Sequence, residues 1–182
     1  RQAFYYPDDD YQILSLDYSQ IELRILASLS KCQSFIEVFN RDEDVHAATA
    51  RAIFNADDDN ARRKAKAVNF GIIYGISDWG LAEQLEIPPK EAKAIIDAFY
   101  KTYPEVGDYL QAVVDQAFKD GYVSTLFGRR RYLRELYDSN YQVREFARRA
   151  AMNAPIQGTA ADLIKLAMVK VQNMLEKNNY RT

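Results

Sequence analysis

A four-residue spacing of cationic and aromatic side chains constrains this chain more than any other feature of its sequence. Arg62, Lys66, Phe70 and Tyr74 follow one another at every fourth position, which predicts one long helix over residues 61–74. Four residues advance a helix by about 400°, so the four side chains form a stripe that drifts about 120° across one face. The predicted helix therefore carries two cations near its N-terminus and two aromatic rings near its C-terminus.

This stripe has the order of groups that a nucleotide needs. The free N–H groups and the dipole at a helix N-terminus favour phosphate, and aromatic rings further along can meet a sugar or a base. The alternative is a solvated basic end followed by a buried aromatic end. Gly71 and Gly75 favour the first interpretation, because a glycine costs about 1 kcal/mol inside a helix and indicates a close approach or a hinge. A P-loop is excluded, since no G-x-x-x-x-G-K-[ST] segment is present.

The rest of the chain predicts a mostly α fold with a small β component, in the α+β class. A strand-like run at residues 13–16 ends at Asp17, and the apolar spacing then becomes helical. A basic hairpin is expected at 122–133, after a helix that ends at Gly121. Besides the helix at 61–74, the predicted helices cover residues 21–29, 44–54, 78–86, 89–101, 105–119, 140–153 and 159–177.

The charge is divided unevenly along a chain long enough for one domain, or for one domain with a small lobe. Residues 1–60 carry 5 basic and 12 acidic side chains, whereas residues 61–182 carry 19 and 14. This split indicates two different electrostatic roles. The single cysteine excludes an internal disulfide framework, and no apolar run reaches the ~20 residues of a membrane helix. We expect a soluble, cytoplasmic protein without a membrane partner.

Several other polar residues could carry chemistry, and each also has an ordinary structural explanation. Asp17, at the end of the predicted strand, could hold Mg²⁺ together with substrate phosphates, or it could cap the next helix. The arginines at 129, 130, 131 and 134 could bind a phosphate backbone or only solvate the surface. Arg149 and Asn153 share a helix face, and Gln157 follows Pro155. His46, the only histidine, lies on the polar side of a short helix.

Together these motifs resemble family A DNA polymerases, the bacterial DNA polymerase I type. The segment from Asp17 to Arg24, D-Y-S-Q-I-E-L-R, is similar to motif A of the family, and Arg62–Gly75 is similar to motif B, the O helix. L-F-G-R-R-R at 126–131 and N-A-P-I-Q-G-T-A-A-D at 153–162 complete the pattern. The resemblance implies the fingers and part of the palm of a right-hand polymerase. Residues 1–30 would be the palm portion, 31–139 the fingers, and 140–182 helices that return to the palm.

The resemblance also implies roles for single residues in template-directed transfer of dNTPs to a primer 3′-OH. Asp17 would be a catalytic, metal-binding aspartate that touches two Mg²⁺ ions. Lys66 would be catalytic and, with Arg62, His46 and Gln20, would hold the incoming triphosphate. These assignments come from the family and not from spacing alone.

The remaining roles concern the sugar, the base and the DNA. Phe70 would lie against the sugar and base of the nucleotide. Glu22 would be the steric gate against a ribose 2′-OH, hydrogen-bonded to Tyr74 at the template-base position. Arg149, Asn153 and Gln157 would read the minor groove of the primer–template end, where acceptors common to all base pairs report correct pairing.

One part of the family pattern is missing. Motif C, which brings the second metal-binding aspartate, is absent from the sequence, so we expect a fragment of a monomeric polymerase that does not polymerise by itself. The alternative is a non-catalytic, nucleic-acid-binding helical module. Asp17 and the stripe from Arg62 to Tyr74 discriminate between the two, because a binding module has no use for a metal carboxylate beside a triphosphate-shaped site.

Overall fold

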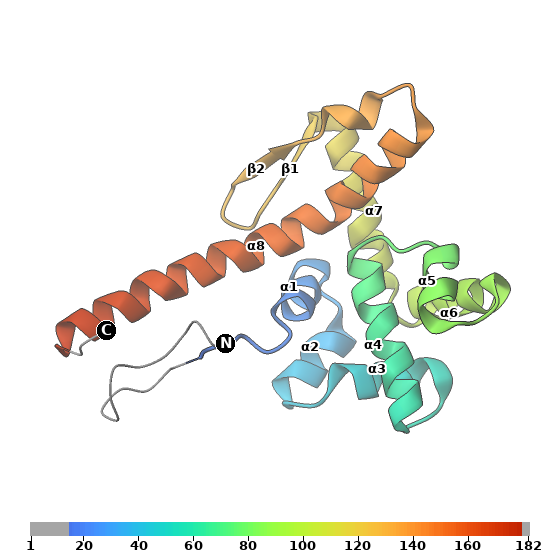
Figure 1. Cartoon of the computed structure of the whole chain (residues 1–182), viewed down its shortest axis with the longest axis horizontal. Coiled ribbons are helices and arrows are strands. Elements are labelled where there is room, and N and C mark those ends of the chain that lie inside the picture. Colours follow the sequence, from blue (N-terminus) through green and yellow to red (C-terminus); the bar gives the residue numbers. More distant parts are fainter. Residues whose placement is uncertain (1–14, 180–182) are drawn as a thin grey trace, which may run out of the picture.

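The computed structural model describes residues 15–179 and confirms the predicted class, since helices dominate and a two-stranded antiparallel sheet is added (Figure 1). In chain order the elements are α1 (Ile21–Ser30), α2 (Gln33–Asn40), α3 (Val45–Phe54), α4 (Asp59–Ile73), α5 (Asp78–Leu85), α6 (Pro89–Thr102), α7 (Pro104–Asp120), β1 (Tyr122–Ser124), β2 (Arg130–Tyr132), η1 (Arg134–Tyr137) and α8 (Tyr141–Lys177).

Local sequence signals set the ends of the helices that matter for the site. Asp44 caps α3 by accepting hydrogen bonds from the backbone N–H groups of His46 and Ala47, and Asp58 caps α4 in the same way. Gly121 ends α7 in the left-handed conformation, with φ of 75°. The boundaries predicted for α1, α3, α4, α5, α6 and α7 are therefore confirmed within two residues.

Two buried clusters hold the elements together. The larger one joins α1, α2 and α4 to α7, and in it the ring of Tyr103 lies 4.5 Å from Phe35 and 5.0 Å from Phe99, between centroids. The smaller one lies under the hairpin and includes Val123, Leu133, Leu136, Ala147 and Ala151. The first cluster fixes α4 against α1, and the second fixes the hairpin against α8.

The predicted break between two C-terminal helices is wrong. Residues 141–177 form one continuous helix, with Pro155 buried inside it. A proline removes one backbone hydrogen bond, but here the hairpin binds the helix just beyond it. Arg129 donates to the carbonyl oxygen of Gly158 at 2.9 Å, and the Leu126 N–H donates to the hydroxyl oxygen of Thr159 at 2.9 Å. Tertiary contacts thus keep this stretch helical across the proline.

Three other differences from the sequence prediction are local. Residues 13 and 14 lie outside the described part, and Ser15 and Leu16 are exposed without strand pairing, so no strand precedes Asp17 there. The helix α2 and the short η1 were not predicted: η1 has only four residues, and α2 was missed although its apolar residues Phe35, Ile36, Val38 and Phe39 follow helical spacing. No helix of the described part is long and apolar enough to cross a membrane.

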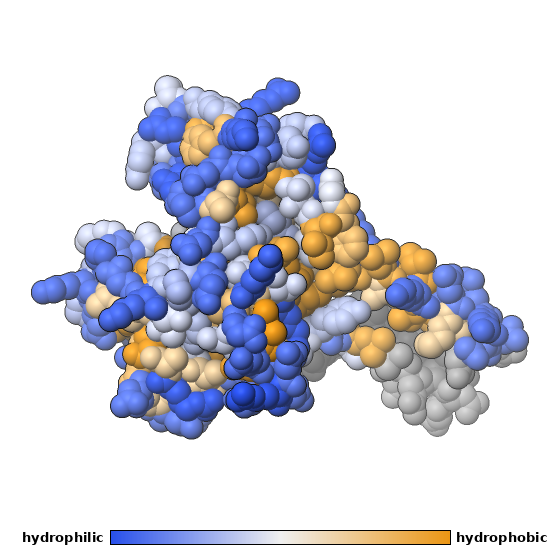
Figure 2. Space-filling model, turned by 180° about the vertical axis from the view of Figure 1, so that it is seen from behind, coloured by the Kyte–Doolittle hydropathy of each residue, from blue (hydrophilic) through white to orange (hydrophobic). Residues whose placement is uncertain are grey.

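The C-terminal half of α8 extends away from the helices α1–α7 (Figure 1). Its apolar side chains remain open to solvent, among them Ile164, Met168 and Val169, which are 43%, 65% and 60% exposed. Apolar surface runs along this arm in the space-filling view (Figure 2). The folded body of the described chain therefore ends near the middle of α8.

Candidate functional site

The stripe on α4 changes from exposed cations to a half-buried ring along its length. Arg62 and Lys66 are exposed, Phe70 is half-buried, and Tyr74, at the C-terminal cap, is 45% exposed. No acidic residue of the described part forms an ion pair with Lys66. A buried aromatic end, the alternative considered for this helix, does not account for Tyr74. The stripe is an accessible surface over most of its length.

Tyr74 connects α4 to the start of α1. Its hydroxyl donates a hydrogen bond of 2.8 Å to Oε2 of Glu22, a residue 52 positions earlier in the chain. The pKa of Tyr74 is raised to about 12, first by burial and then by the hydrogen bond to the Glu22 carboxylate and its negative charge. The Glu22–Tyr74 pair that the family resemblance implied is therefore confirmed, and it places Glu22 at the aromatic end of the stripe.

The two glycines of this region mark close approaches, as their positions predicted. A Cβ on Gly71 would lie 2.7 Å from Cγ2 of Ile76, and one on Gly75 would lie 2.8 Å from Cγ of Arg149. Gly75 also has φ of +66°, which disfavours any side chain. Because of this approach, Arg149 of α8 reaches α4 and lines a hollow of about 420 Å³ together with Phe70 and Tyr74.

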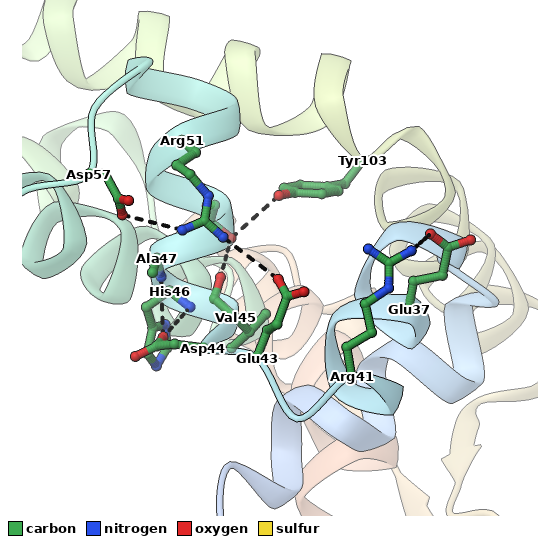
Figure 3. A network of polar contacts seen from close by, with 11 residues as sticks. Glu37, Arg41, Glu43, Asp44, Val45, His46, Ala47, Arg51, Asp57 and Tyr103 are labelled. Carbon is green, nitrogen blue, oxygen red and sulfur yellow. Dashed lines mark hydrogen bonds and ion pairs between the residues drawn. The ribbon is translucent and has the colours of Figure 1, made fainter.

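At the other end of the stripe, Asp44 holds Arg62. Oδ2 of Asp44 lies 2.6 Å from Nη2 and 2.8 Å from Nε of Arg62. Oδ1 of the same carboxylate accepts hydrogen bonds from the N–H groups of His46 and Ala47 and so caps α3 (Figure 3). Burial alone would raise the pKa of the Asp44 carboxyl, but the hydrogen bonds from Arg62 and from the N–H groups of Ala47 and His46 outweigh it and lower the pKa. One carboxylate thus fixes both the start of α3 and the guanidinium that faces α3 from α4.

His46 lies behind this ion pair and is 2% exposed. The predicted position of His46 on the polar side of its helix is wrong, because the residue faces α4 and not solvent. Its Nδ1 lies 3.1 Å from Nδ2 of the buried Asn69, and its ring centroid is 5.7 Å from that of Phe70. Burial lowers the pKa of His46; Asp44 opposes this shift, and Arg62 and Lys66 add to it. His46 is therefore held neutral between α3 and α4.

The three residues expected to read DNA lie along one face of α8. Because α8 is continuous, Arg149, Asn153 and Gln157 are spaced by four residues on one helix. Arg149 meets α4, whereas Gln157 is exposed and lines a second hollow of about 380 Å³ with the hairpin arginines 129–131. Between them Asn153 is buried, and its Nδ2 has no hydrogen-bond partner among the described residues. The structure thus places Arg149 and Gln157 at two different hollows, with Asn153 buried between them.

The hairpin is attached to α8 by an ion pair. Nε of Arg129 lies 2.9 Å from Oδ1 of Asp162, and the Asp162 side chain is only 13% exposed. A Cβ on Gly158 would lie 2.6 Å from Cγ2 of Thr125, so the hairpin packs directly on the helix backbone. Arg129, although exposed, is therefore bound to Asp162 and Gly158 of α8, whereas Arg130 and Arg131 are exposed beside Gln157 without an ion pair to a described residue.

Asp17 lies apart from these contacts. It is exposed in the segment before α1, beside a hollow of about 370 Å³ whose other lining residues, such as Leu16, Ile164 and Met168, are mostly apolar. Within residues 15–179, no group of three or more His, Cys, Asp and Glu side chains could hold a metal ion. Mg²⁺ accepts one or two carboxylates together with substrate phosphates. Asp17 therefore fits as one ligand of a Mg²⁺ ion, but the described residues do not form a complete metal centre.

Gln20 stands between Asp17 and Glu22 at the turn into α1. Its backbone is left-handed, with φ of 54° and ψ of 37°, and its side chain makes no capping hydrogen bond. The turn directs Asp17, Gln20 and Glu22 to the same end of α1. Asp44 and Asn69 were not predicted as partners of the site, although an aspartate at the start of a predicted helix, as Asp44 is, is a capping signal.

Comparisons with known proteins agree with this geometry. The sequence model of DNA polymerase family A matches residues 1–182. DNA polymerase I of Bacillus caldotenax is 49% identical over 181 residues, which are 97% of this chain and 21% of that protein. DNA polymerase I of Bacillus subtilis (strain 168) is 48% identical over 185 residues, 100% of this chain and 21% of that protein. The chain spans about a fifth of the length of these curated relatives.

A solved structure is similar as well. The POL domain of Pol1 from M. smegmatis, in complex with DNA primer-template and dNTP, superposes with a TM-score of 0.86 at 50% identity. The superposition covers 91% of this chain and 30% of that domain.

Proposed function

This chain belongs to DNA polymerase family A, and from that premise we propose that it forms the fingers and part of the palm of a DNA-directed DNA polymerase. In this proposal, the polymerase that contains it transfers dNTPs to a primer 3′-OH under the direction of a template. Residues 31–139 are the fingers, with residues 1–30 and 140–182 as the palm-facing parts. The bound DNA primer-template and dNTP of the M. smegmatis domain support these partners.

One observation carries the proposal: the hydrogen bond of 2.8 Å from Tyr74 to Glu22. It joins the end of the α4 stripe to the segment that carries Asp17 and Gln20. A nucleotide with its triphosphate at Arg62 and Lys66 and its sugar against Phe70 would then have its base end near Tyr74. A helical module that only binds nucleic acid has no reason to assemble these two segments.

In this arrangement each side chain of the stripe has a separate task. Lys66 has no ion-pair partner within residues 15–179, so it is available to hold and neutralise phosphate. Arg62 reaches phosphate from its place on Asp44, and His46 adds a neutral side chain behind it. Gln20 and Glu22 border the sugar, where the carboxylate of Glu22 would oppose a 2′-hydroxyl. Orientation by several fixed groups is the main contribution that a protein makes to phosphoryl transfer.

Asp17 would supply one carboxylate to Mg²⁺ in the assembled polymerase. When bound there, Mg²⁺ ions activate the attacking hydroxyl and neutralise the charge on the leaving phosphates. The described residues contribute the exposed carboxylate and its position before α1. On α8, Arg149 would hold the primer–template end beside the nucleotide, with Asn153 and Gln157 further along the minor groove.

The proposal is tested by separating the nucleotide site from the DNA site in the polymerase that contains this chain. Lys66→Ala should raise the KM for dNTP and leave the Kd for primer–template unchanged, whereas Arg149→Ala should weaken primer–template binding. Steady-state extension and a DNA-binding titration measure the two quantities. Identical profiles for the two variants would contradict separate sites.

A further inference from the structure

A buried polar cluster lies directly behind the exposed stripe of α4. His46 and Thr49 come from α3 and Asn69 comes from α4, and their exposed fractions are 2%, 0% and 0%. Buried polar groups are nearly always hydrogen-bonded. Because the cluster has few partners, the direction of each hydrogen bond can be followed from atom to atom.

Thr49 determines the first step. Its single hydroxyl proton faces two acceptors, the backbone carbonyl oxygen of Val45 at 2.9 Å and Oδ1 of Asn69 at 3.2 Å, and we assign it to the shorter contact with Val45. The hydroxyl oxygen is then an acceptor, and Nδ2 of Asn69 donates to it at 3.1 Å. The hydroxyl of Tyr103 approaches the same oxygen from α7 at 3.5 Å. These contacts fix the amide plane of Asn69 inside the protein.

Asn69 determines the second step. Its amide nitrogen carries two protons, and the one not donated to Thr49 faces Nδ1 of His46 at 3.1 Å. A neutral imidazole has one donor nitrogen and one acceptor nitrogen, and the partner of one sets the proton on the other. With an N–H donor against Nδ1, the proton belongs on Nε2.

The surroundings of His46 disfavour its charged form as well. The cations Arg62 and Lys66 lie on α4, and Asp44 before α3 is the acidic group that opposes them. A protonated Nδ1 would also set one N–H against another across the 3.1 Å contact. Nε2 makes no hydrogen bond with residues 15–179, so among these residues its proton has no acceptor.

We propose that Asn69 is a positioning residue that holds His46 as the neutral tautomer with its proton on Nε2. Resting on the function proposed above, this makes His46 a hydrogen-bond donor to a phosphate oxygen of the nucleotide, and not a third positive charge beside Arg62 and Lys66. The tautomer itself is a property of the nucleotide-free chain, so it can be tested without a nucleotide.

The first experiment uses the fact that His46 is the only histidine. Two-bond ¹⁵N–¹H correlation spectra of the ¹⁵N-labelled chain report directly which ring nitrogen carries the proton. We expect one set of signals at pH 7, with Nε2 protonated and Nδ1 unprotonated, and a titration below the ordinary pKa of histidine. A proton on Nδ1, or averaging of the two tautomers as in a free histidine, would overturn the proposal.

Two variants test whether Asn69 is the cause. In Asn69→Asp a carboxylate replaces the donor, so the proton should move to Nδ1 and the pKa of His46 should rise by roughly one to three units. In Asn69→Leu, which keeps the approximate shape, the single tautomer should be lost. Asn60→Asp adds the same charge to the exposed first turn of α4 and should leave His46 unchanged.

Wild-type behaviour of His46 in both Asn69 variants would refute the role of Asn69. If Asn69→Asp fails to fold, the wild-type spectrum and Asn69→Leu still decide the question. The activity of Lys66→Ala and Arg149→Ala variants does not enter this test, so a failure of the proposed polymerase function would be recognised separately.

Discussion

The two ends of the candidate site differ in how fully this chain builds them. Between α3 and α4, Arg62 is paired with Asp44, and His46 is hydrogen-bonded to Asn69. Before α1, Asp17 stands exposed beside a mostly apolar hollow. The proposed nucleotide-binding end is therefore preorganised by residues close to it, whereas the proposed metal-binding end consists of one carboxylate among the residues described.

The difference follows from how each end is held in place. Helices α3 and α4 pack on one another and share a core with α1 and α6, so their polar side chains meet in fixed positions. Asp17 belongs to a segment with no regular structure, and the neighbouring face of α8 is open to solvent (Figure 2).

The largest effect is expected at the less complete end. In the polymerase that contains this chain, Asp17→Asn should lower kcat by roughly 10³-fold or more, because a metal-bound carboxylate supports several kcal/mol of transition-state stabilisation. Primer–template affinity should stay near the wild-type value. Single-turnover extension under saturating DNA measures the loss.

Asp42→Asn is the matched control, since Asp42 is also exposed and lies in a left-handed turn that asparagine accepts. It should leave kcat unchanged. Near-normal turnover in Asp17→Asn would remove Asp17 from the metal site and leave the α4 stripe as the main part of the proposal.

A smaller effect is expected at the preorganised end. Lys66→Ala removes a charged group that would hydrogen-bond the triphosphate, and such bonds contribute about 1.5–3 kcal/mol. We expect kcat/KM for dNTP to fall about ten- to a hundredfold. Lys64→Ala, two positions earlier on another side of α4, should have no comparable effect. Equal losses in both variants would indicate a general effect of charge and not a specific contact.

Much of the fold could be predicted because its signals are local. Asp58 before α4, Gly121 after α7 and the apolar spacing of α1 each determine a helix end or face from nearby residues. The prediction at Pro155 was wrong because it used local sequence alone. A proline predicts a break from local chemistry, but the hairpin contacts of Gly158 and Thr159 come from distant sequence and keep α8 intact.

The site residues also differ in whether local sequence alone predicts them. The stripe from Arg62 to Tyr74 was visible because its members share one helix face. The roles of Asp44 and Asn69 were not, because each depends on a contact across elements, to Arg62 at 2.6 Å and to His46 at 3.1 Å. The burial of His46 was missed as well, since spacing within α3 does not reveal that α4 covers this face.

Two substitutions of Asp44 separate its contribution as the cap of α3 from its ion pair with Arg62. Asp44→Ala loses both the α3 cap and the Arg62 pair, and it should lower the free energy of unfolding by about 1–2 kcal/mol, of which the cap gives about 1 kcal/mol and the exposed pair less. Asp44→Asn keeps a capping oxygen and should lower the free energy of unfolding by less. Urea unfolding of the chain measures both. Equal costs would show that the pair with Arg62, and not the cap, is the main contribution.

The same carboxylate predicts an acid dependence. The pKa of Asp44 is lowered on folding from its ordinary value of 3.8, so its stabilisation is fully present above that value and is lost as the pH falls through the lowered pKa. Asp44→Asn should remove this part of the pH dependence. An unchanged acid profile in Asp44→Asn would contradict the lowered pKa.

The smallest effect is expected at the connection between the two ends. Tyr74→Phe removes the hydrogen bond to Glu22, and because Tyr74 is 45% exposed, water can replace the lost partner. We therefore expect a loss at the low end of the usual range, about 0.5–1 kcal/mol, in urea unfolding at pH 7. Tyr141→Phe is the control, since its exposed hydroxyl donates no hydrogen bond to a described residue.

Alkaline pH sharpens this last test. The pKa of Tyr74 is raised on folding from 10.0 to about 12, so its contribution is fully present below the unfolded pKa and is lost as the pH rises through the folded one. The stability difference between wild type and Tyr74→Phe should therefore shrink between about pH 10 and pH 12. The free energy of unfolding of Tyr141→Phe should change with pH in the same way as that of wild type over this range. A constant difference for Tyr74→Phe would contradict the raised pKa of Tyr74, which burial and the contact with Glu22 produce together.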